Sequence, residues 1–140
     1  MQFITFSVDN RHFAVDLASV ERVVLAVALI PLPHAPKNIG GAIDVHGEIV
    51  PVIALRRVLS VTDRDLELTD QFIICQINET KAALWVDSVD DVAEYQAKDM
   101  IPPEKGMLAG EYVRWVIKDK DKTMLVCDWD KMYQLNLAFT

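Results

Sequence analysis

Hydrophobic and polar residues follow one another in short runs along this chain, with the period of β-strands rather than of helices. The first run, residues 3–8, is rich in β-branched and aromatic residues and ends at the turn signal Asp9-Asn10. A second run at 13–15 completes a predicted hairpin. Similar runs continue through the chain, so the pattern predicts an all-β fold, with further strands at 20–32, 42–45, 48–53, 72–77, 82–86, 89–95, 112–117 and 123–127.

The pattern of the first half recurs in the second half. When the chain is shifted so that Phe3 falls on Phe72, the two segments match without a gap as far as Val23 on Val92. A helical turn is expected at 55–59, and the polar stretch 60–70 is expected to be a loop. This loop separates two halves, at about 1–62 and 70–135, of a single domain that spans residues 1–140. About five short strands per half must close to hide their edges. The repeat therefore suggests two small barrels side by side, with an apolar seam in which a partner's helix could lie.

The amino-acid composition excludes several classes of function. Hydrophobic residues make up 51% of the chain and charged residues 25%, which is typical of a folded domain. The net charge of −7 argues against binding to nucleic acid or to anionic membranes. Neither a membrane-spanning apolar run nor a secretory signal is found, so we expect a cytoplasmic protein without membrane insertion. Cys75 and Cys127 are far apart in sequence, which favours buried free thiols.

Candidate catalytic chemistry is sparse. The three histidines, His12, His34 and His46, lack the spacing of a metal site, and no nucleophile elbow or phosphate-binding glycine loop occurs. The acidic set 87, 90, 91 and 94 lacks the glycine and the terminal glutamate of a calcium loop, so a solvated strand edge is the simpler interpretation. We therefore expect no catalytic residues, no metal and no cofactor. An enzyme with dispersed carboxylates stays open as a third hypothesis.

One segment carries a resemblance to a known family. The signature of CheW proteins reads roughly G-V-I-N-L-R-G-x-I-V-P-V-I-D-L-R, and it is similar to Gly41-Ala42-Ile43-Asp44-Val45-His46-Gly47-Glu48-Ile49-Val50-Pro51-Val52-Ile53-Ala54-Leu55-Arg56. Further segments resemble family elements and occur in the same order as in the family, at 6–15, 20–24 and 33–36 before this signature and at 84–92 and 101–103 after it. The resemblance covers residues from about 2 to about 133, and the order and spacing of its parts make it specific.

The resemblance implies a fold and a function. The family fold is two similar five-stranded SH3-like β-barrels packed side by side around a shared apolar core. The family function is that of a non-enzymatic signal-transduction adaptor, which scaffolds the cytoplasmic tips of chemoreceptors to the histidine kinase CheA through the CheW-like regulatory domain of that kinase. The main alternative is a sensory or ligand-binding β-barrel module that uses the groove between the barrels.

Receptor-facing residues are carried over by position from the same resemblance. They are Val20, Gly41, His46, Gly47, Phe72 and Ile73. For Val20, Phe72 and Ile73, a place in the barrel core is an equally good expectation. Among the departures from the family pattern are His46 in place of arginine, Ala54 in place of aspartate and Trp115 in place of glycine. Histidine lacks the permanent charge and planar fork of arginine, so His46 bears directly on the receptor contact.

Overall fold

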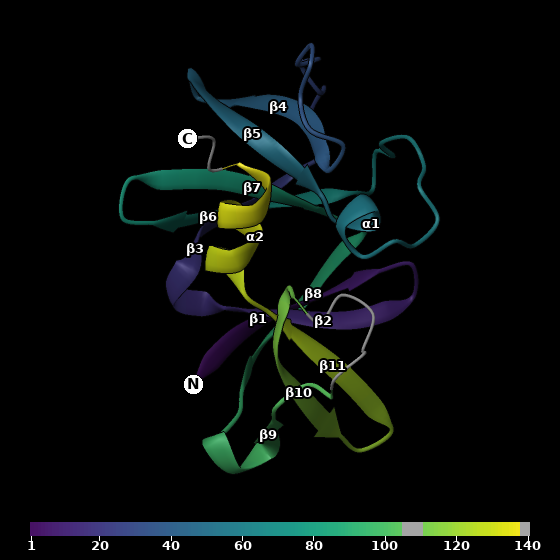
Figure 1. Ribbon diagram of the computed structural model, residues 1–140, viewed down its shortest axis with the longest axis vertical. Coiled ribbons are helices and arrows are strands. Elements are labelled where there is room, and N and C mark those ends of the chain that lie inside the picture. Colours follow the sequence, from purple (N-terminus) through teal and green to yellow (C-terminus); the bar gives the residue numbers. More distant parts are fainter. Residues whose placement is uncertain (105–110, 138–140) are drawn as a thin grey trace.

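Two β-sheets that face a common interior make up the structure, a computed structural model that describes residues 1–104 and 111–137 (Figure 1). Sheet A has six strands in the order β8-β1-β2-β11-β10-β9, and sheet B has five in the order β3-β6-β7-β5-β4. The elements are β1 (Gln2–Val8), β2 (Arg11–Asp16), η1 (Leu17–Ser19), β3 (Val20–Leu25), β4 (Ile39–Val45), β5 (Glu48–Ala54), α1 (Leu55–Val58), β6 (Gln71–Ile77), β7 (Thr80–Val86), β8 (Ser88–Glu94), η2 (Ala97–Asp99), β9 (Met100–Ile101), β10 (Val113–Asp119), β11 (Lys122–Cys127) and α2 (Trp129–Asn136). The predicted all-β fold is confirmed.

The largest differences from the expected elements concern one strand and one helix. The strand expected at 20–32 ends at Leu25, because the chain leaves the sheet and returns only as the single bridge between Ile30 and Ala42. The helix α2 was not predicted at all. In the described parts of the chain, neither α1 nor α2 is long and apolar enough to cross a bilayer.

Strands from the two halves of the sequence are exchanged between the sheets. The β1–β2 hairpin of the first half lies between β8 and β11 of the second half, and the β6–β7 hairpin of the second half lies between β3 and β5 of the first. Parallel pairs, β2 with β11 and β5 with β7, join the halves in each sheet. Neither sheet is therefore built from one half of the sequence alone. Periodicity identifies strands but not their partners, and in this fold the hairpin edges are paired by strands of the other half.

The parallel strand pair of sheet A and that of sheet B nevertheless have the same residue register. In the parallel pair of sheet B, Val52 lies opposite Ala83, and in that of sheet A, Val126 lies opposite Ala14. Ala83 is the residue on which Ala14 falls in the sequence shift that superimposes Phe3 on Phe72. The repeat predicted from sequence is thus followed at the level of single residue pairs.

The β-bulges recur at equivalent places as well. In sheet B, the register of β3 against β6 shifts between Val20 and Arg22, which leaves Glu21 as the extra residue. In sheet A, the register of β8 against β1 shifts in the same way and leaves Asp90 as the extra residue. A second pair of bulges leaves Gly40 unpaired in β4 and Arg114 unpaired in β10. Bulges redirect side chains, so each of them creates a local site on an otherwise regular strand.

A common core lies between the sheets, and α2 closes it. Phe6 and Phe13 of sheet A, Ile73 and Leu84 of sheet B, and Met132 of α2 belong to one cluster of buried side chains. The two phenylalanine rings stack with their centroids 5.8 Å apart. Figure 1 shows α2 across the space between the two sheets, so its apolar side is buried by both of them.

Substitution of Met132 should test whether α2 is an integral part of this core. Met132→Ala is expected to lower the free energy of unfolding by about 2–5 kcal/mol, because it leaves a cavity between the sheets. Leu135→Ala on the exposed side of the same helix is the control and should cost less than about 0.5 kcal/mol. Denaturant unfolding of both variants measures the difference, and equal losses would contradict the placement of α2.

Candidate interaction site

The β4–β5 turn presents His46 to solvent. His46 and Gly47 have positive φ angles of 52° and 87°, as the central residues of a tight hairpin turn require. The side chain of Asp44 holds the turn, since its Oδ1 accepts a hydrogen bond of 2.8 Å from the Gly47 amide. His46 is exposed, and no hydrogen bond or ion pair joins its side chain to the described residues. The imidazole is therefore displayed by a fixed backbone and is free to bind something else.

A charged pocket lies beside this turn on sheet B. We call it the His46 pocket; its volume is about 200 Å³, and it is lined by Glu21, Arg22, Val45, His46, Glu48, Val50, Ile74 and Lys81. The bulge in β3 explains why the successive residues Glu21 and Arg22 both reach it. Strands β3, β4, β5, β6 and β7 thus all contribute to this pocket.

Lys81 bridges two carboxylates in the His46 pocket. Its Nζ lies 2.7 Å from Oε2 of Glu21 and 2.8 Å from Oε2 of Glu48. The hydrogen bond from Lys81 lowers the pKa of Glu21, and the hydrogen bond to Glu21 raises the pKa of Lys81. Both groups therefore stay charged at neutral pH. Arg22 contacts Glu21 at only 3.5 Å, and 43% of its side chain is exposed.

The other predicted receptor-facing residues are spread over sheet B. Val20 is half-buried at the start of β3, opposite Cys75. Phe72 and Ile73 of β6 have no exposed surface, because Phe72 packs in a cluster with Ile43, Val52 and Trp85 of sheet B and Ile73 packs in the core shared by the two sheets. Their side chains are core residues, the other of the two expectations for them, and they do not contact a partner directly. The structure therefore brings His46 and Gly47 together with the bulged part of β3, but it does not gather all six residues on one surface.

Gly41 has a backbone role. Its φ of 125° is a conformation that residues with a side chain rarely adopt, and a Cβ atom added there would lie 2.7 Å from the carbonyl oxygen of Ile30. Ile30 and Ala42 exchange backbone hydrogen bonds of 2.7 and 2.9 Å across this contact. The absence of a side chain at Gly41 thus allows the segment around Ile30 to pack closely against β4 at the edge of sheet B. Trp115 occupies the equivalent position in sheet A.

An ion network at the junction of the sheets was missed by the sequence analysis. Asp87 follows β7 of sheet B and precedes β8 of sheet A, so the chain crosses between the sheets at this residue. The Asp87 carboxylate accepts hydrogen bonds of 2.6 Å from Nη2 of Arg56 and 3.1 Å from Nη2 of Arg64. It also accepts one of 2.8 Å from the amide of Asp9 in the β1–β2 turn. We call this group the Asp87 clamp. It corrects the assignment of Asp87 to a solvated edge, a description that fits the exposed residues of β8 at 90, 91 and 94.

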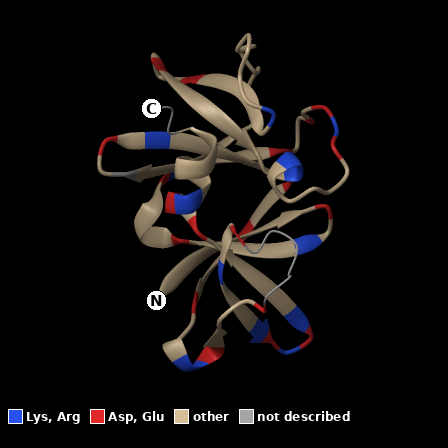
Figure 2. Cartoon of the chain, in the orientation of Figure 1, with Lys and Arg blue, Asp and Glu red and all other residues tan. Residues whose placement is uncertain are grey.

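Asp70 extends the clamp into the interior. Its carboxylate is fully buried and receives two hydrogen bonds of 2.8 Å from Arg64, one of 3.0 Å from the indole of Trp85 and one of 2.9 Å from the Glu67 amide. Burial alone would raise the pKa of Asp70, but these donors outweigh it and hold the pKa below its usual value. The loop 60–70, which carries charges of both signs in Figure 2, is thereby fixed to sheet B.

An apolar groove lies elsewhere, beside α2. Its volume is about 660 Å³, and it is lined by Leu32, Pro33, His34, Ala35, Pro36, Ile39, Pro51, Tyr133 and Leu137. The side chain of Asn136 fixes one wall to the other, because its Oδ1 accepts a hydrogen bond of 3.0 Å from Nδ2 of Asn38.

Groups suited to covalent or metal chemistry are not assembled in the described parts of the chain. Among residues 1–104 and 111–137, no three His, Cys, Asp or Glu side chains are placed to hold a metal ion. Cys75 and Cys127 are both buried free thiols, and burial raises their pKa, that of Cys127 to about 12. They therefore behave as small apolar core residues at neutral pH.

Comparison with known proteins decides the family. The family model described as a CheW-like domain matches residues 2–136. The chain belongs to the CheW family. Proteins of this family are non-enzymatic scaffolds or adaptors, and this chain is accordingly a chemotaxis coupling protein rather than an enzyme.

Individual relatives agree with this membership. The chemotaxis protein CheW of Treponema pallidum is 23% identical over 138 residues, which cover 94% of this chain and 81% of the relative. That of Thermotoga maritima is 20% identical over 133 residues, or 95% and 87% of the two chains. The crystal structure of the scaffolding protein TtCheW from Thermoanaerobacter tengcongensis has a TM-score of 0.84 and 27% identity, and it covers 91% of this chain and 84% of its own. The predicted fold class is therefore confirmed by a solved CheW structure.

Two glycines offer a matched test of the backbone of sheet B. Gly41→Ala is expected to destabilise the protein by about 2–3 kcal/mol, because a positive φ and a clash with the Ile30 carbonyl act together. Gly47→Ala meets no atom within 4 Å, so only its positive φ is unfavourable and the loss should be about 1 kcal/mol. Chemical denaturation measures both, and a smaller loss for Gly41→Ala than for Gly47→Ala would contradict the close approach.

Acid should weaken the contribution of Asp70 to stability. A carboxyl group with a lowered pKa stabilises the folded state above its unfolded pKa of about 3.9 and loses this effect as the pH falls through the folded value. Asp70→Asn should therefore cost about 3 kcal/mol near neutral pH, and the gap to the parent protein should narrow below about pH 4.

The exposed Asp63, which pairs with Arg57 at 3.1 Å, provides the control for this measurement. Asp63→Asn should change the free energy of unfolding by less than about 0.5 kcal/mol at any pH. Unfolding curves at several pH values separate the two cases, and a gap for Asp70→Asn that did not depend on pH would be evidence against its ionised state in the fold.

Proposed function

We propose that this CheW-family protein is a cytoplasmic adaptor that holds the helical tip of a chemoreceptor and the regulatory domain of the histidine kinase CheA in one geometry. The observation that carries the proposal is the match of residues 2–136 to the CheW-like domain. The TtCheW relative is itself called a scaffolding protein. The arrangement of exposed charge around a fixed turn supports a binding role.

Scaffolding of this kind needs only differential affinity. A receptor that changes conformation alters the kinase only if the adaptor binds the two kinase states with different free energies, typically by about 1–3 kcal/mol. A rigid adaptor transmits such a difference better than a flexible one. The Asp87 clamp and the shared core provide this rigidity, because they tie both sheets together.

The receptor-facing surface that we propose is centred on the β4–β5 turn and the bulged part of β3. His46 and Gly47 form its exposed tip, and Val20 leads into it from the start of β3. Phe72 and Ile73 support it from the neighbouring strand β6, since they pair with Val24 and Val23 of β3. Gly41 supports it through the backbone geometry of β4.

The alternative is a sensory module that binds a small apolar molecule. The groove beside α2 favours this function, because it is lined mostly by apolar side chains and has a volume of about 660 Å³. A rise in melting temperature with apolar ligands, abolished by Tyr133→Ala, would support it. The groove is open and the family is one of scaffolds, so the adaptor function remains the better supported.

Binding assays with both proposed partners test the adaptor function. The protein should bind a purified receptor cytoplasmic fragment and a CheA regulatory domain, each measured separately. His46→Arg should leave folding intact and change receptor affinity, because it adds a permanent charge at the tip of the turn. Lys120→Arg in the equivalent β10–β11 turn of sheet A is the control and should leave receptor affinity unchanged. Binding to neither partner would overturn the proposal.

A further inference from the structure

Some polar side chains of the His46 pocket bind one another, whereas others have hydrogen-bond donors without a close partner. Both oxygens of Glu48 lie within 3.2 Å of Lys81, and the two oxygens of Glu21 contact Lys81 and Arg22. Lys81 thus pairs with both glutamates and directs its ammonium group at them. Arg22 has five N–H donors and a single contact at 3.5 Å, while the side chain of His46 has no partner among the described residues.

We propose that Arg22 and His46 form a carboxylate-binding pocket that accepts an acidic side chain from the helical tip of the receptor. This inference rests on the proposed function and specifies the chemistry of its receptor contact. Arginine binds a carboxylate with two parallel hydrogen bonds, which gives both strength and orientation. Histidine adds one further donor beside it.

A basic side chain fits the same pocket poorly. It would meet Arg22 and Lys81, and it would find the oxygens of Glu21 and Glu48 already bound to these cations. An incoming carboxylate meets donors that have no comparable partner. Its repulsion from the two glutamates is reduced because Lys81 lies 2.7 and 2.8 Å from them. The available donors of Arg22 and His46, and not the net charge of the pocket, therefore favour an acidic occupant.

The local backbone already holds the two donors in place. The bulge at Glu21 turns Arg22 into the pocket, and the Asp44 hydrogen bond fixes the turn that carries His46. The backbone between β3 and this turn therefore needs no rearrangement when a carboxylate binds, and the entropy lost is that of the two side chains.

Sheet A does not offer an equivalent site. The register places Asp91 of β8 where sheet B has Arg22, and Lys120 of the β10–β11 turn where sheet B has His46. An aspartate in the place of the arginine removes the bidentate donor and repels an acidic group. The carboxylate-binding arrangement is therefore specific to sheet B among these two equivalent faces.

Charge reversal at Arg22 tests the inference. Arg22→Glu should weaken binding to the receptor fragment at least about tenfold and reduce its dependence on salt. Arg22→Lys, which keeps the charge but loses the fork, should fall between the parent and Arg22→Glu. Binding to the CheA regulatory domain should stay unchanged, which excludes a general loss of structure.

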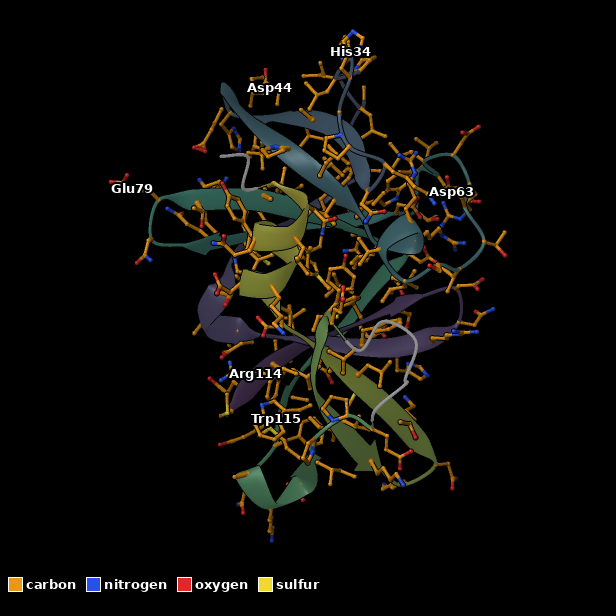
Figure 3. All side chains as sticks on the ribbon, in the orientation of Figure 1. His34, Asp44, Asp63, Glu79, Arg114 and Trp115 are labelled. Carbon is orange, nitrogen blue, oxygen red and sulfur yellow. The ribbon has the colours of Figure 1, made fainter. Side chains whose placement is uncertain are left out.

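Arg114 provides a matched control. It is an exposed arginine in a bulge of sheet A, and Figure 3 shows it well apart from Asp44 and the β4–β5 turn. Arg114→Glu makes the same change in net charge, so it should alter receptor affinity by less than about twofold. Equal weakening by Arg22→Glu and Arg114→Glu would overturn the inference, because only the overall charge would then matter.

A compensating change on the receptor identifies the acidic group. Each exposed acidic residue of the receptor tip is changed to lysine, and one of these variants should bind Arg22→Glu more tightly than it binds the parent protein. If no such variant restores binding, the inference is overturned while the adaptor function stands. If the parent protein binds no receptor fragment at all, the adaptor function and the inference fail together.

Discussion

One charged residue, Asp87, joins segments of both sheets at a point where the chain passes from sheet B to sheet A. Asp87 receives hydrogen bonds from Arg56, Arg64 and the Asp9 amide, which come from three different segments. Because these groups are partly buried, loss of the carboxylate would leave Arg56 without its closest carboxylate and would leave Arg64 bonded mainly to Asp70. The apolar core supplies most of the burial, but it is the less directional interaction and does not by itself fix an angle between sheets.

A firm junction matters because the proposed receptor surface lies on sheet B alone. Arg64 connects the clamp to Asp70, Asp70 is bonded to Trp85, and Trp85 lies in β7 next to β6 and β5. The same β7 carries Lys81, which anchors the two glutamates of the His46 pocket. One strand therefore links the interior of the junction with the charged surface, and a force applied at the turn is resisted by the whole sheet.

Much of the fold follows from local sequence, and the reasons are physical. Runs of β-branched and aromatic residues predicted most of the strands, and the Phe3-on-Phe72 shift predicted that the two halves repeat one pattern. Strand pairing between the halves was not predictable, since alternation carries no information about partners. Helix α2 was missed because Trp129 and Met132 resemble the end of a strand when their contacts with both sheets are unknown.

The residues of the candidate site likewise fall into those that the sequence indicates and those that only the fold reveals. His46 and Gly47 were found because their turn and the family signature coincide in sequence. Arg22 and Lys81 were not singled out, since their role depends on a bulge and on cross-strand neighbours that only the folded sheet brings together. Asp87 was misjudged for the same reason, because an aspartate among other acidic residues looks exposed until its two arginines are seen.

The exchanged hairpins have a consequence for how this chain could be divided. A cut within the loop 60–70 would separate β1 and β2 from both of their flanking strands, β8 and β11, and would separate β6 and β7 from β3 and β5. Neither fragment could then complete a sheet, whereas the two together hold every strand that each sheet requires. Reassembly of such fragments would restore all pairings at once, so a protein severed at this loop would behave as an obligate two-piece complex.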